Sequence, residues 1–125
     1  MSYHLTLEEH PGYLHATATG THTPENALRF LKDVHEACTQ RGYSAVLLEM
    51  NLAGPSLDST SIFRVIAQRS IDAAGLKKIA YVDASSRDPE KMKFAETVAI
   101  NRGVNVRLFQ DLALAKEWMA LDPGP

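Results

Sequence analysis

Acidic and hydroxyl side chains follow the two most apolar strand-like segments of the chain. Glu49 lies near the end of segment 44–50, and Asp83 directly follows the next such segment. Asp58 and Ser59 begin a helical pattern between the two. Because ligands of open α/β sheets bind at the edge where parallel strands end, we expect these side chains to gather along one rim. Such a cluster could bind Mg²⁺ or serve in catalysis, but acids at strand ends and helix starts are common without any function, and that interpretation is favoured.

The five histidines and the single cysteine form no recognisable metal or nucleophile motif. No two histidines have the i, i+4 spacing of a helical zinc site. His4 and His15 lie on alternating segments and could face each other across a hairpin, but no third ligand can be placed beside them. Cys38 belongs to the apolar stripe of a helical segment and is interpreted as a small core residue. Since phosphate-binding glycine loops are also absent from the sequence, we predict no catalytic residue, no metal and no cofactor, and a protein that is not an enzyme.

The composition is that of a single globular domain. Of the 125 residues, 45% are hydrophobic and 22% are charged, and the formal net charge is -2. This balance gives no reason to expect a nucleic acid or an anionic membrane surface as partner. The single cysteine excludes an intrachain disulfide, the first residues do not resemble a signal peptide, and no apolar run is long enough for membrane insertion. We expect one cytoplasmic domain over residues 1–121, followed by a tail over 122–125.

Hydrophobic periodicity predicts strands and helices in the order β-β-α-β-α-β-α-β-α. The expected strands are 3–9, 13–20, 44–50, 78–82 and 104–109, and the expected helices are 24–41, 58–74, 89–102 and 112–122. Alternating strands and helices indicate an α/β fold with a mixed, mostly parallel five-stranded sheet and four helices. In the last helix, Leu114, Trp118 and Leu121 are expected to share one face. The exposed edge of the first strand could pair with a second copy and form a homodimer.

The start of the second helix has hydroxyl groups beside an acid. Ser56 or Asp58 can accept hydrogen bonds from the free backbone N–H groups of the first turn. Ser59 and Thr60 would then lie exposed in that turn. On pattern alone, helix capping is the favoured interpretation of this stretch.

The same stretch and the end of the chain carry a family resemblance. The chain finishes with a short strand, an acidic residue and a helix containing alanine and tryptophan, namely Phe109, Asp111, Ala115 and Trp118. With the opening hairpin and the strand–helix alternation, these features resemble a STAS domain over nearly the whole chain, and most closely the small stage II sporulation protein AA-like antagonists of anti-sigma factors. Such antagonists carry an Asp-Ser-Ser-Gly-Leu-like stretch at this helix start. The matching residues here are Asp58, Ser59, Thr60, Ser61 and Ile62, with Ser61 in place of the glycine.

This resemblance implies a non-enzymatic regulatory module that acts by protein–protein interaction. It implies that Ser59 is the phosphoacceptor of a partner kinase, and that the partner is an anti-sigma-factor-like, kinase-like or other regulatory protein. The implied interaction surface comprises Asn51, Asp58, Ser59, Thr60 and Asp83. A phosphate on Ser59 would add about -1.5 to -2 charges beside Asp58 and disrupt partner binding by repulsion.

A second hypothesis is a small binding protein for an apolar or lipid-like ligand. STAS-like folds resemble lipid carriers of the CRAL-TRIO type, which is an analogy of fold alone. The second helix also begins with apolar residues on more than one face. A ligand binder should contain a cavity of roughly 300 Å³ or more, lined by residues such as Phe63, Ile66 and Phe94.

Overall fold

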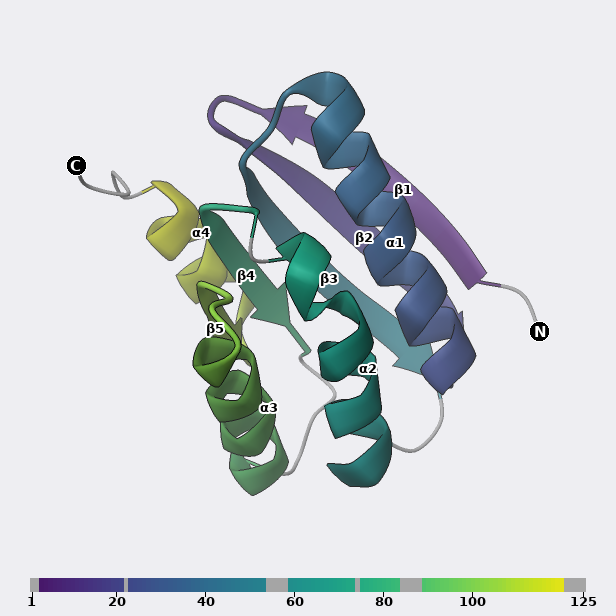
Figure 1. The fold of residues 1–125 in the computed structure, drawn as a ribbon. Coiled ribbons are helices and arrows are strands. Elements are labelled where there is room, and N and C mark those ends of the chain that lie inside the picture. Colours follow the sequence, from purple (N-terminus) through teal and green to yellow (C-terminus); the bar gives the residue numbers. More distant parts are fainter. Residues whose placement is uncertain (1–2, 22, 54–58, 74, 84–88, 121–125) are drawn as a thin grey trace.

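One five-stranded sheet with four helices forms the protein, in a computed structural model that describes residues 3–21, 23–53, 59–73, 75–83 and 89–120 (Figure 1). The strand order in the sheet is β1-β2-β3-β4-β5. β1 is antiparallel to β2, and all other neighbours are parallel. The predicted α/β fold and element order are therefore confirmed. The elements are β1 Tyr3–His10, β2 Tyr13–Thr21, α1 Pro24–Arg41, β3 Ala45–Ala53, α2 Ser59–Ala73, β4 Lys78–Val82, α3 Pro89–Asn101, β5 Val106–Phe109 and α4 Leu112–Ala120.

The β1–β2 hairpin is closed by the dipeptide Pro11-Gly12. Gly12 has a φ of 88°, and proline followed by a residue of positive φ is typical of a type II turn. The turn makes His10 the partner of Tyr13, so counting back along both strands pairs Glu8 with His15. His4 is paired with Thr19 instead. The expectation that His4 faces His15 is therefore wrong, because a turn this short fixes the register of the hairpin.

The sheet has two unequal covers (Figure 1). α1, α2 and α3 lie together over one face, and α4 lies on the other. The larger core, beneath α1 to α3, takes alternate strand residues such as Leu14, Ala16 and Leu48. The smaller core, beneath α4, takes the residues between them, such as Leu47 and Ala80. Successive strand residues point to opposite faces, so each central strand contributes to both cores.

Local signals fix both ends of α1. The Thr23 side chain accepts a hydrogen bond from the Asn26 backbone N–H at 3.1 Å, and Pro24 occupies the first turn. Gly42 ends the helix with a φ of 76°, a left-handed conformation that glycine adopts without strain. Cys38 is fully buried in the apolar stripe of α1, as predicted.

α4 faces the sheet with a different stripe from the one expected. Ala115 and Met119 are its buried residues, Trp118 packs at their side, and the Leu114 side chain is 54% exposed. The small side chain of Ala115 lets the helix approach the sheet closely. The Nζ atom of Lys78 lies 4.6 Å from the Trp118 ring centroid and donates a hydrogen bond to the Trp118 carbonyl. Leu121 lies outside the described residues. None of the helices in the described part of the chain has the length and apolar character needed to cross a membrane.

Candidate functional site

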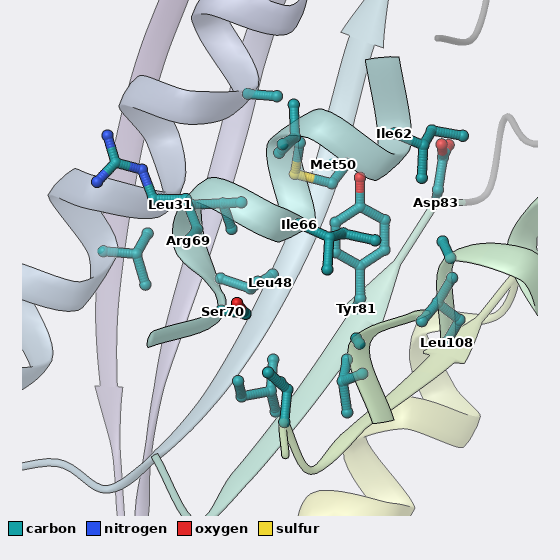
Figure 2. Close-up of a pocket in the computed structure, with 18 of the residues that line it drawn as sticks. Leu31, Leu48, Met50, Ile62, Ile66, Arg69, Ser70, Tyr81, Asp83 and Leu108 are labelled. Carbon is teal, nitrogen blue, oxygen red and sulfur yellow. The ribbon is translucent and has the colours of Figure 1, made fainter. Parts of the chain in front are cut away.

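An apolar cavity of about 200 Å³ lies between the sheet and the helices α1, α2 and α3 (Figure 2). Its floor consists of strand residues that alternate toward this face, such as Leu48 and Met50 from β3 and Tyr81 from β4. Helical residues such as Leu31 and Ile66 form the walls. The volume is smaller than the roughly 300 Å³ expected for a pocket that takes a drug-sized ligand. The cavity can therefore enclose only a small molecule.

Helix geometry explains which residues of α2 and α3 reach the cavity. Residues three and four apart lie on one side of a helix, and the α2 residues in the wall are Ile62, Val65, Ile66, Arg69 and Ser70. On α3 the corresponding residues are Lys91, Met92, Ala95 and Ala99. Ile66 was expected in the cavity and lies there. Phe63 and Phe94, expected beside it, are not among the lining residues, and their side chains are 45% and 39% exposed.

Tyr81 and Asp83 bring polar atoms to this mostly apolar cavity. The Tyr81 ring stands on β4 and carries its hydroxyl group toward Met50 and Ile62 (Figure 2). Burial raises the pKa of the Tyr81 hydroxyl, and the negative charge of Asp83 raises it further. The hydroxyl therefore remains protonated and can donate a hydrogen bond. Asp83 lies just beyond the end of β4 and is only 8% exposed. An apolar cavity with a fixed hydroxyl donor can both enclose and orient a small ligand.

The sequence contains a signal for Tyr81 in the alternation of segment 78–82. Ile79 and Tyr81 alternate there with Ala80 and Val82. The first pair faces the cavity, and the second pair faces α4. Two-residue alternation therefore identifies Tyr81 as a cavity residue once the helices are assigned to that face. The sequence alone does not make that assignment, which is why Tyr81 was missed.

The acids expected along one rim are separated by the sheet. Glu49 points to the same face as Leu47, whereas Asp83 lines the cavity on the opposite face. The parallel register explains this, because it pairs Glu49 with Val82 and leaves Asp83 one residue further along the pleat. The two carboxylates therefore do not form a common metal or catalytic site.

The expected interaction surface is only partly within the described residues. Asp58 lies outside them, and Ser59 is described only in its backbone, as the first residue of α2. Thr60 is exposed in the first turn of that helix. Asn51 is exposed and donates a hydrogen bond to Glu49 at 2.9 Å, on the face away from Asp83. Asn51 and Asp83 are thus not on one continuous face of the sheet.

No protein-family model matches the chain, and a search of curated proteins finds no match either.

Proposed function

We propose that the protein binds a small apolar ligand in the cavity beneath α1, α2 and α3. The observation that supports this proposal is a cavity of about 200 Å³ with almost entirely apolar walls. Protein interiors are otherwise packed as densely as organic crystals. An engineered apolar cavity of about 150 Å³ in another protein binds benzene. The expected ligand is therefore a compact molecule of about ten non-hydrogen atoms, with at most one polar end.

The apolar lining of the cavity favours an apolar ligand. Each Å² of apolar surface that is removed from water on binding contributes roughly 25 cal/mol. An apolar ligand that fills the space restores the missing van der Waals contacts. The Tyr81 hydroxyl supplies one hydrogen bond, which favours a ligand with a single uncharged carbonyl or hydroxyl oxygen, because a carboxylate would be repelled by Asp83.

The proposal is tested with two uncharged probes, indole and octanol, whose binding to the purified protein is measured by methyl NMR and calorimetry. We expect both probes to shift the methyl signals of Ile66 and Leu48 and to raise the melting temperature. Ala95→Leu fills part of the cavity and should weaken binding by about tenfold or more, since each buried methylene group of a ligand contributes about 0.8 kcal/mol.

Phe94→Leu is the matched control, because it changes the adjacent residue to the same side chain outside the cavity. It should leave probe affinity unchanged. Equal affinity in Ala95→Leu and the unaltered protein would refute the proposal, as would probes that shift only signals outside the cavity. Circular dichroism of both variants verifies that each one folds.

We also retain, as a proposal, a cytoplasmic STAS-like interaction module with Ser59 as phosphoacceptor. Its support is the resemblance of residues 58–62 to the antagonist stretch, together with the position of Ser59 at the beginning of α2. Phosphate at a helix N-terminus is favourable. Mass spectrometry of the protein from its own cells, compared with Ser59→Ala, tests this proposal. The absence of a phosphate on Ser59 in cells where the protein is active would count against it.

A further inference from the structure

The outer face of the β1–β2 hairpin carries a compact group of nitrogen and carboxylate ligands, Glu8, His10 and His15, here named the hairpin cluster. One ligand atom from each lies within 4.8 Å of the other two. The hairpin register produces this arrangement. Glu8 is directly opposite His15, and His10 follows Glu8 by two residues on the same side of β1. The cluster lies on the face opposite the apolar cavity and does not depend on the proposed ligand binding.

His15 is the buried member of the cluster. It is 6% exposed, and its Nδ1 atom has no hydrogen-bond partner within the described part of the chain. The Nε2 atom of His10 is also buried without a hydrogen bond, although Glu8 Oε1 lies 3.2 Å away. Buried polar atoms without partners are uncommon in native proteins, and a bound ion is one way in which such atoms are satisfied. Two unpartnered imidazole nitrogens beside a carboxylate are suited to bind a cation.

The opposite side of the His15 ring is held by a carboxylate. Its Nε2 atom lies 2.8 Å from Glu49 Oε1. The other oxygen of the same carboxylate, Glu49 Oε2, accepts a hydrogen bond from the Asn51 side chain at 2.9 Å. An ionised carboxylate only accepts hydrogen bonds, so His15 Nε2 carries the proton and its Nδ1 keeps a free lone pair. Carboxylates orient metal-binding histidines in this way.

The second imidazole is also fixed in place. The His10 ring stacks on Tyr13, with ring centroids 4.9 Å apart and an angle of 9° between the planes. Glu8, by contrast, has a side chain that is 66% exposed and is free to rotate toward an ion arriving from solvent. Two positioned nitrogen ligands and one adjustable oxygen ligand therefore face the same small volume.

We propose that the hairpin cluster is a Zn²⁺ site in which Glu8, His10 and His15 are the protein ligands. Two imidazoles and one carboxylate are a ligand set that zinc accepts, with a fourth position for water. Neighbouring ligand atoms around tetrahedral zinc lie about 3.3 Å apart, so the cluster has to contract from its present spacing. The exposed Glu8 side chain can supply most of that movement. Glu49 is a positioning residue that keeps His15 in the metal-binding tautomer.

The test is calorimetric titration of Zn²⁺ into the full chain after treatment with a chelator. Visible spectroscopy with Co²⁺ then reports the coordination geometry. We expect one ion per chain and a tetrahedral Co²⁺ spectrum. Glu8→Gln and His10→Ala should each weaken Zn²⁺ binding by more than about 100-fold, whereas Glu49→Gln should weaken it by about 10- to 100-fold, as outer residues of metal sites do. Glu8 is exposed, so its variant is expected to fold normally.

His4→Ala is the matched control, because His4 is an exposed histidine on the same face of β1, paired with Thr19 and distant from His15 in the register. It should bind Zn²⁺ like the unaltered protein. The proposal is overturned if Zn²⁺ fails to bind at millimolar concentration, or if the Glu8 and His10 variants bind as tightly as the His4 variant. An octahedral Co²⁺ spectrum would also contradict the proposed ligand set.

Discussion

The two faces of the sheet differ in the polarity of the side chains that they present. On the face beneath α1, α2 and α3, β2 contributes Leu14, Ala16 and Ala18, all fully buried. On the other face the same strand contributes Tyr13, His15 and Thr17, next to the carboxylates of Glu8 and Glu49. A shift of one residue along the chain therefore separates an apolar environment from one that contains titratable groups.

The second face itself divides where α4 stops covering it. Leu47 and Ala80 pack beneath α4 and are apolar, whereas Glu49 lies two residues further along β3 and is hydrogen-bonded to His15. The strand residues on this face are thus apolar where α4 covers them and polar where it does not. This small sheet therefore has room for two independent sites, the apolar cavity on one face and the hairpin cluster on the other.

The largest expected effect is a difference in the stability that is lost when a residue of β2 is truncated on one face or on the other. Leu14→Ala removes a fully buried side chain from the larger core and should lower the free energy of unfolding by about 2–5 kcal/mol. Thr17→Ala, on the same strand but the opposite face, should lower it by about 1 kcal/mol or less. Urea denaturation of both variants measures the difference. Similar losses would mean that the second face is packed as tightly as the first.

A smaller change in the free energy of unfolding is expected at alkaline pH, from the titration of Cys38 in the larger core. Burial raises the pKa of the Cys38 thiol from 9.0 to about 11. The unfolded chain releases this proton more readily than the folded protein, so the contribution of Cys38 to stability is complete below pH 9.0 and is lost as the pH rises toward 11. Urea denaturation across this range should show a falling free energy of unfolding.

Cys38→Ala is the control for that titration. The variant should be somewhat less stable at neutral pH, but its stability should depend less steeply on pH above 9.0. Burial, assisted by the hydrogen bond to Asp33, also raises the pKa of Tyr3 to about 12, so part of the alkaline loss remains in the variant. An identical pH dependence with and without the thiol would show that Cys38 titrates as it does in water.

The fold was predictable because its signals are local. Thr23, Pro24 and Gly42 determine the ends of α1 through contacts within a few residues, and strand alternation separates the faces of β1 and β2. The pairing of Glu8 with His15 also follows from the short Pro11-Gly12 turn, although it was not drawn from the sequence. Counting outward from that turn would have placed Glu8 and His10 beside His15.

The cavity was not predictable to the same extent, because it depends on how each helix is rotated. Residues three apart on a helix, such as Phe63 and Ile66, point only about 60° apart, so a small rotation of the helix decides which of the two meets the sheet. In α2, Ile66 lines the cavity and Phe63 does not. The volume left between the layers depends on the combined size of residues from several elements. No single segment of the sequence encodes it.

The smallest expected effect concerns the helix that partly covers the second face. Leu114 is 54% exposed on α4, so Leu114→Gln should change the free energy of unfolding by no more than about 0.5 kcal/mol. Met119→Ala, on the buried side of the same helix, should lower it by about 2 kcal/mol or more. Thermal and urea denaturation distinguish the two. A large loss in Leu114→Gln would place that leucine in a buried contact, and the boundary between the covered and open parts of the second face would have to be redrawn.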